Sequence, residues 1–185
     1  MTEGRPRSYD YTKRAGAREL SWEDFAALAG QLTEALARRK IDTVVGIARG
    51  GLFPATAVAC ALRCELYPVR VTRRLHDEVV YDSPLWRVPV SPLVEGKAVA
   101  IIDDVCDTGE SLALVAAQVR ALKAERAVTA ALIAHSWAEP AADVSALLTD
   151  ELVIFPWDSS VYLEGRWQPH PEIERALRAQ AGDDA

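Results

Sequence analysis

The sequence has 185 residues, of which 50% are apolar and 26% charged. This is the size and composition of one globular domain, and it excludes a disordered, collagen-like or disulfide-stapled chain. The 21 Lys and Arg residues are outnumbered by 27 Asp and Glu residues, so the net charge is −6. A surface of that charge has no general attraction for nucleic acid or anionic membranes. We expect neither as a partner, and any bound anion must be held by a local site.

Residues 1–19 form a polar arm that lacks the apolar run of a signal peptide. No apolar stretch approaches the roughly 20 residues that a membrane-spanning helix needs. These features predict a soluble, cytoplasmic protein. In that reducing compartment, the cysteines are expected to be buried thiols, because they lie in apolar or alanine-rich surroundings: Cys60, Cys64 and Cys106.

The first predicted helix covers residues 20–40. Ser21 and Asp24 stand at the spacing of a capping box, and apolar residues then recur every three or four positions. The short β-branched run at residues 43–47 predicts a buried strand. An alanine-rich helix that reaches residue 62 follows it.

Strands and helices alternate along the rest of the chain. We expect strands at residues 65–72, 98–102, 128–134 and 152–155, and a helix at residues 110–123. Residues 73–95 are less regular, and the alternation at residues 85–88 indicates part of a hairpin. The other strands are continuously apolar, which is typical of a parallel sheet covered on both faces. The sequence therefore predicts an α/β fold with a central parallel sheet flanked by helices.

The strongest functional signal comes at the end of the strand at residues 98–102. Two adjacent carboxylates, Asp103 and Asp104, are followed by a polar segment that leads into the next helix. Ligands of parallel sheets bind beyond the carboxyl ends of the strands. Backbone N–H groups, hydroxyls and the helix dipole of the polar segment would form a phosphate cradle. The cradle would consist of Asp107, Thr108, Gly109, Glu110 and Ser111.

Asp103 and Asp104 suit another part of the ligand, because carboxylates repel a phosphate. They fit hydroxyl groups, which donate to carboxylates, or a divalent cation. Adjacent hydroxyls with a terminal phosphate describe a ribose 5-phosphate. An alternative that needs no ligand is that Asp107 and Glu110 form a capping box for the following helix. Capping leaves the other two carboxylates unexplained.

A second anion-binding turn is predicted at residues 46–51, again between a strand and a helix. Gly50 and Gly51 permit the turn, and Arg49 with exposed backbone N–H groups would hold an anion. A Gly-Gly turn of this kind is by itself often purely structural. Together with the carboxylate segment, it becomes the second of two anion cradles that flank a sugar.

The two segments resemble those of the type I phosphoribosyltransferases. Residues 98–112 look like the phosphoribosyl-pyrophosphate (PRPP) motif of that family, in which an apolar run precedes two acids and Asp-Thr-Gly-x-Ser. Residues 46–54 are similar to its pyrophosphate loop, and residues 153–158 to the hood segment of its 6-oxopurine branch. The resemblance covers residues 42–158.

The resemblance implies one phosphoribosyltransferase domain over residues 1–185, with a Rossmann-like core and a small hood. The core would span residues 42–135 and carry a mobile loop at about residues 73–95 that closes over the reaction. The hood strand and C-terminal segment would occupy residues 136–185. Family members are usually dimers, which implies a homodimer.

The resemblance also implies roles for single residues. Asp103 and Asp104 would bind the ribose hydroxyls and take part in holding Mg²⁺, largely through substrate oxygens and water. Asp107 would be a general acid or base close to the substrate base, and residues 108–111 would hold the 5-phosphate. Pyrophosphate would bind at Arg49, Gly50 and Gly51. For Arg70, Arg73 and Arg74 at the root of the loop, pyrophosphate contact and ordinary surface charge both remain open.

The substrate base would be recognised by His135, Leu152, Val153 and Asp158. His135 stands where the 6-oxopurine enzymes typically have a Lys, and Leu152 where they have a stacking aromatic residue. Trp137 is a candidate to supply that stacking from the neighbouring loop. A plain alternative for His135 is a hydrogen-bonded residue at the end of a strand.

The expected function is PRPP-dependent transfer of a phosphoribosyl group to a 6-oxopurine base, with Mg²⁺ as cofactor and release of pyrophosphate. One alternative is a regulator that keeps the PRPP site as a sensor. Another is a phosphoribosyltransferase for a different base.

Overall fold

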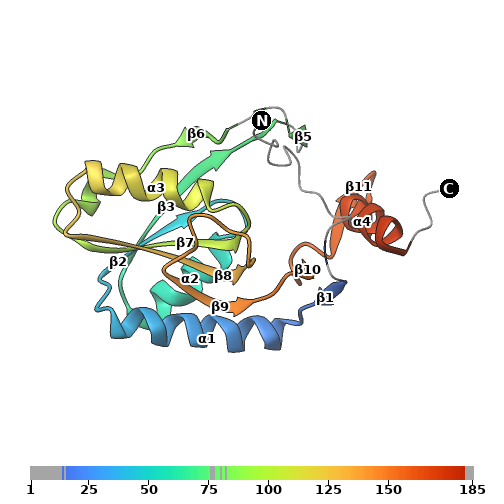
Figure 1. Cartoon of the computed structure of the whole chain (residues 1–185), viewed down its shortest axis with the longest axis horizontal. Coiled ribbons are helices and arrows are strands. Elements are labelled where there is room, and N and C mark those ends of the chain that lie inside the picture. The colour runs from blue at the N-terminus through green and yellow to red at the C-terminus, as the bar shows by residue number, and fades with distance from the viewer. Residues whose placement is uncertain (1–13, 15, 76–77, 80, 82, 182–185) are drawn as a thin grey trace. The chain divides into compact units, whose positions relative to one another are not determined.

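The computed structural model of the protein describes residues 14, 16–75, 78–79, 81 and 83–181 (Figure 1). Their contacts divide the chain into two compact units. The larger is Ala27–Thr149, and the smaller combines Met1–Ala26 with Asp150–Ala185. Most of the predicted polar arm lies outside the described residues, and the organisation as one domain stays a prediction. None of the helices that the structure describes has both the length and the apolar content that a membrane crossing requires.

The larger unit is built on a six-stranded sheet with the strand order β6-β3-β2-β7-β8-β9. Every neighbouring pair from β3 to β9 is parallel, and β6 pairs antiparallel with β3 at the edge. The parallel strands are β2 (Thr43–Ile47), β3 (Glu65–Thr72), β7 (Ala98–Cys106), β8 (Arg126–Ala134) and β9 (Val144–Leu148); β6 is Leu85–Val88. The predicted α/β fold with a central, mostly parallel sheet is confirmed.

Helices cover both faces of this sheet, as Figure 1 shows. They are α1 (Trp22–Arg38), α2 (Leu52–Leu62) and α3 (Glu110–Ala121). Successive side chains of a strand point to opposite faces. Accordingly, Ala100 and Ile102 of β7 belong to the core cluster of α1 and α2, whereas Val99 and Ile101 belong to that of α3. This two-sided burial is why the strands are continuously apolar.

Helix α1 begins with the predicted capping box. The backbone N–H of Asp24 donates to Ser21 Oγ (3.1 Å), and the backbone N–H of Ser21 donates to Asp24 Oδ2 (2.9 Å). The side-chain and backbone hydrogen bonds from Ser21 lower the pKa of Asp24. Further along the helix, Leu32 and Leu36 are fully buried against the sheet.

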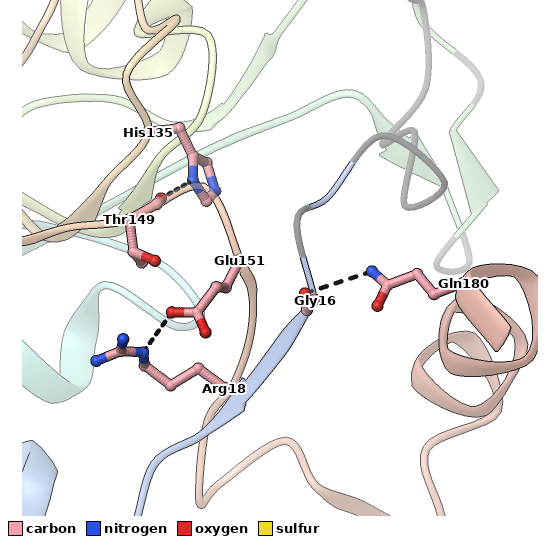
Figure 2. A network of polar contacts seen from close by, with 6 residues as sticks. All are labelled: Gly16, Arg18, His135, Thr149, Glu151 and Gln180. Atoms are coloured by element: carbon pink, nitrogen blue, oxygen red, sulfur yellow. Dashed lines mark hydrogen bonds and ion pairs between the residues drawn. The ribbon is translucent and has the colours of Figure 1, made fainter.

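The smaller unit contains strands that do not belong to the central sheet. β1 (Ala17–Glu19) pairs in parallel with β10 (Leu152–Ile154), and β11 (Ser160–Leu163) forms a hairpin with β12 (Arg166–Pro169). The C-terminal helix is α4 (Pro171–Ala181). Figure 2 shows Arg18 Nε donating to Glu151 Oε2 (2.6 Å) and Gln180 Nε2 donating to the Gly16 carbonyl (3.5 Å).

Three differences from the predicted elements affect the site. β7 continues four residues beyond 102 to Cys106, because Asp103, Val105 and Cys106 remain paired with β8; backbone pairing overrides the low strand propensity of Asp. The predicted strand at 152–155 pairs with β1, and the unpredicted β9 takes the sheet edge.

Other expectations for local structure were also wrong or incomplete. The alternating segment at residues 85–88 is strand β6, but its antiparallel partner is β3. Residues 73–95 also contain the short pair β4 (Arg74–Leu75) and β5 (Glu78–Val79) and the 3₁₀ turn Pro92–Val94; the mobility of this loop stays a prediction. Among the free cysteines Cys106 is buried, whereas Cys60 is exposed and Cys64 is partly exposed, because Cys60 lies on the outer side of α2.

Candidate active site

The two carboxylates at the centre of the site belong to the last half of β7. The backbone N–H of Asp104 donates to Asp103 Oδ1 (3.0 Å), and that of Val105 donates to Asp104 Oδ1 (2.9 Å). Burial of the Asp103 carboxyl raises its pKa well above the usual Asp value, and the neighbouring Asp104 charge adds to the shift. Two adjacent, half-buried carboxyl groups of this kind favour hydroxyl donors or a cation as ligands.

The glycine turn after β2 lies directly against these carboxylates. A Cβ on Gly50 would come within 1.7 Å of Asp104 Oδ2, and one on Gly51 within 2.7 Å of Asp103 Oδ1. The Ala48–Arg49 peptide bond is cis, and Arg49 is exposed. Only glycine, which has no Cβ, lets residues 50 and 51 lie this close to the two carboxylates. The structure thus brings the predicted glycine turn against the two carboxylates at the carboxyl ends of β2 and β7.

The polar segment after β7 turns at Gly109 into α3. Gly109 has a positive φ of 81° and is the N-cap of the helix, which has no side-chain cap hydrogen bond. The alternative interpretation of Asp107 and Glu110 as a capping box is therefore not what the structure shows. The backbone N–H of Glu110 lies 3.4 Å from Thr108 Oγ1, and a Cβ on Gly109 would meet the Pro140 carbonyl oxygen at 2.0 Å. An anion cradle at this helix N-terminus stays a prediction.

Asp107 has a partner that the sequence did not reveal. The indole Nε1–H of Trp137 donates to Asp107 Oδ1 (3.0 Å). The same indole stacks on His135, with ring centroids 4.6 Å apart and planes 15° apart. Only the nearness of residue 137 to the end of β8 could have suggested the contact, because β7 and β8 are neighbours in the sheet.

His135 is buried directly after β8. Its backbone N–H donates to the Cys106 carbonyl (3.1 Å), and its Nδ1 lies 2.5 Å from the Thr149 carbonyl (Figure 2). A carbonyl only accepts, so Nδ1 carries a hydrogen. His135 is thus a hydrogen-bonded residue at a strand end, and base recognition by it stays a prediction.

The basic residues that precede the irregular segment take different positions. Arg73 Nη1 lies 3.9 Å from Glu110 Oε2 at the start of α3, whereas Arg70 is exposed on β3. The side chain of Arg74 lies outside the described structure. Pyrophosphate contact by these residues stays a prediction.

The remaining predicted base-binding residues belong to the smaller unit. Leu152 is buried and Val153 half-buried on β10. Asp158 is exposed after the strand; its backbone N–H donates to the Phe155 carbonyl (3.0 Å), and its Oδ1 lies 3.8 Å from His170 Nε2. Trp157, which precedes Asp158, stacks on Phe155 with ring centroids 4.6 Å apart. Trp157 is thus a packing residue. The roles of Leu152, Val153 and Asp158 toward a base stay predictions.

The donor set also bears on metal binding. Within the part of the chain that the structure describes, no group of three or more His, Cys, Asp or Glu side chains could hold a metal ion. Two neighbouring carboxylates fit a Mg²⁺ ion that takes its other ligands from a phosphorylated substrate and water. They do not form a cage made by protein alone.

Comparison with known proteins decides the family. The model of the phosphoribosyl transferase domain matches residues 17–162. The chain belongs to the phosphoribosyltransferase family. It is therefore a transferase enzyme, as the two motifs predict.

Two relatives of this phosphoribosyltransferase are xanthine-guanine phosphoribosyltransferases. It is 30% identical over 161 residues to a xanthine-guanine phosphoribosyltransferase of Cereibacter sphaeroides, covering 85% of this chain and 89% of that protein. A xanthine-guanine phosphoribosyltransferase of Gluconobacter oxydans is 31% identical over 120 residues, which are 63% of this chain and 68% of that protein.

The fold is also similar to that of a solved structure. The purine phosphoribosyltransferase of Pyrococcus horikoshii superposes with a TM-score of 0.69 at 29% identity, covering 80% of this chain and 98% of that one. The fold that carries the β7 motif and the glycine turn is thus similar to that of a solved phosphoribosyltransferase.

Proposed function

We propose that this phosphoribosyltransferase transfers the phosphoribosyl group of PRPP to a 6-oxopurine base and releases pyrophosphate. The observation that carries the proposal is the contact of the glycine turn at Gly50 and Gly51 with the acids Asp103 and Asp104. This contact puts a turn suited to pyrophosphate beside carboxylates suited to ribose hydroxyls. The names of the relatives in Cereibacter and Gluconobacter support a xanthine or guanine substrate.

In the proposed reaction, a ring nitrogen of the base attacks C1 of the ribose. The C1–N bond forms as the C1–O bond to pyrophosphate breaks, and the bonding electron pair leaves with pyrophosphate. Charge develops as an oxocarbenium-like sugar and an anionic leaving group. Asp103 and Asp104 would favour the cation and bind the ribose hydroxyls, while Arg49 and the N–H groups of Gly50 and Gly51 would stabilise the leaving pyrophosphate.

Two further groups complete the proposed mechanism. Asp107 would accept the proton that the base nitrogen loses, and backbone N–H groups at residues 108–111 would hold the 5-phosphate. Asp103 and Asp104 would hold Mg²⁺ together with substrate oxygens. When bound there, Mg²⁺ supplies positive charge against the pyrophosphate oxygens.

Recognition of the base is proposed to involve His135, Leu152, Val153 and Asp158. A panel of hypoxanthine, guanine, xanthine, adenine and orotate with PRPP and Mg²⁺, in which nucleotide and pyrophosphate are both measured, tests the proposal. Turnover with 6-oxopurines and not with adenine or orotate is expected. Turnover with adenine or orotate alone would assign another base, and PRPP binding without turnover on any base would instead indicate a sensor.

We further propose that the enzyme is a cytoplasmic homodimer, on the likeness to its family. Sedimentation equilibrium at micromolar concentration should return twice the chain mass of 20.2 kDa. A mass of one chain at every concentration would refute the dimer.

A further inference from the structure

We propose that Trp137 is a positioning residue for Asp107. The inference rests on the proposed function, because it concerns the proton transfer assigned there to Asp107. It goes beyond that function by naming the group that orients the carboxylate and the residue that supports this group.

The contact is a hydrogen bond from the indole of Trp137, whose side chain is partly exposed beside the end of β8. Nε1–H of Trp137 donates to Asp107 Oδ1 at 3.0 Å, the usual length of an N–H···O bond. Indole nitrogen only donates, so it holds one carboxylate oxygen and cannot take the proton that the carboxylate is proposed to receive. A lysine or arginine in that position would orient Asp107 as well, but would add a full positive charge next to the developing cation.

The indole is itself held from behind by His135. The two rings are stacked, with centroids 4.6 Å apart, and the imidazole is buried. Nδ1–H of His135 donates to the Thr149 carbonyl (Figure 2), and the backbone N–H of Thr149 donates to the Ala134 carbonyl at 3.1 Å. The end of β8 and the residue after β9 thus fix the imidazole, and the imidazole fixes the plane of the indole.

Loss of the hydrogen bond between Trp137 and Asp107 should affect the catalytic rate rather than the affinity for substrate. A carboxylate at the end of a short side chain has rotational freedom, and misplacement by about 1 Å is enough to slow a proton transfer strongly. Trp137 and Asp107 both lie in the larger unit, Ala27–Thr149, so the contact is internal to that unit. Loss of the indole N–H should lower kcat and leave KM for PRPP nearly unchanged.

The first experiment is steady-state kinetics of Trp137→Phe with PRPP and the best base. Phe keeps a ring that can stack on His135 and removes the N–H. We expect kcat to fall roughly tenfold, as for a lost hydrogen bond to a charged group. Trp167→Phe is the matched control, because Trp167 is 71% exposed on β12; its kcat should equal that of the wild type. In the double variant with Asp107→Asn, Trp137→Phe should cause no further loss.

The second experiment detects the contact without turnover. In ¹H–¹⁵N NMR spectra of the ligand-free enzyme, Trp137→Phe assigns the indole resonance of Trp137, and Asp107→Asn should shift that resonance while the others stay in place. An unmoved resonance, an unchanged kcat in Trp137→Phe, or full additivity in the double variant would each overturn the proposal. These failures leave wild-type turnover intact. Lack of wild-type turnover with every base would instead refute the proposed function, and with it the role of the contact.

Discussion

Gly50 lies against the carboxylate of Asp104 so closely that a Cβ on Gly50 would fall 1.7 Å from Asp104 Oδ2. The two residues come from the carboxyl ends of β2 and β7, which are neighbours in the sheet. Such a separation is far below any contact between a real Cβ and an oxygen, so the missing side chain is a requirement of the site. The glycine turn after β2 and the acids of β7 are therefore in direct contact.

The first prediction concerns this contact. Gly50→Ala should lower turnover at least about tenfold, because overpacking of this size costs about 1–3 kcal/mol and displaces Asp104. Gly30→Ala is the control: no atom lies within 4 Å of a Cβ there, and Ala in the middle of α1 should raise the free energy of unfolding by about 0.5–1 kcal/mol. Kinetics with PRPP and urea unfolding measure both. Full activity of Gly50→Ala would contradict the geometry.

The second prediction separates strain from collision at two positive-φ glycines. Gly96→Ala should cost only about 1 kcal/mol of unfolding free energy, because φ is +67° but no atom lies within 4 Å of the new Cβ. Gly109→Ala should cost more, because the Cβ also meets the Pro140 carbonyl oxygen at 2.0 Å. It should in addition weaken binding of PRPP in a calorimetric titration, whereas Gly96→Ala should leave it unchanged. Equal losses of stability would refute the role of the Pro140 contact.

The third prediction tests Asp107 as the proton acceptor. Asp107→Asn should lower the single-turnover rate by roughly 10²–10⁴. The amide keeps the size of the side chain and an oxygen that accepts from Trp137 Nε1, so PRPP binding should change little. Rapid-quench measurement with saturating PRPP reports the chemical step. A rate near that of the wild type would remove Asp107 from proton transfer.

The fourth prediction follows from the raised pKa of Asp103. The folded chain holds this proton more tightly than the unfolded chain, so above the ordinary Asp pKa of 3.8 the free energy of unfolding should fall as pH rises, until the folded pKa is passed. Asp103→Asn removes this loss. The variant should therefore be the more stable protein at pH 7 and no more stable than the wild type below pH 3.8.

Urea unfolding across a pH series, with EDTA and without PRPP, measures the effect. Glu125→Gln is the control, because it makes the same change from carboxylate to amide at an exposed position. It should show no pH-dependent gain. A wild type that is as stable as Asp103→Asn at pH 7 would show that burial does not penalise this carboxylate.

Local patterns in the chain were enough to predict the core strands β2 and β3 with their observed bounds. Continuous apolar runs can only be buried on both faces, and the capping residues Ser21 and Asp24 mark a helix start wherever they stand. The acids in the second half of β7 and the glycine and hydroxyl residues that follow it could also be recognised, because the predicted anion cradle consists of neighbouring residues at one strand end.

Contacts between distant residues required the folded chain. β7 runs on through Asp103 and Asp104 because β8 pairs with it, and the strand at 152–154 pairs with β1 because backbone hydrogen bonds, not hydrophobicity, decide its neighbour. Likewise Gly50 meets Asp104, and Trp137 reaches Asp107, across adjacent strands. The local sequence was enough to identify the chemical groups of each segment. The order of strands in the sheet determined which distant groups come into contact.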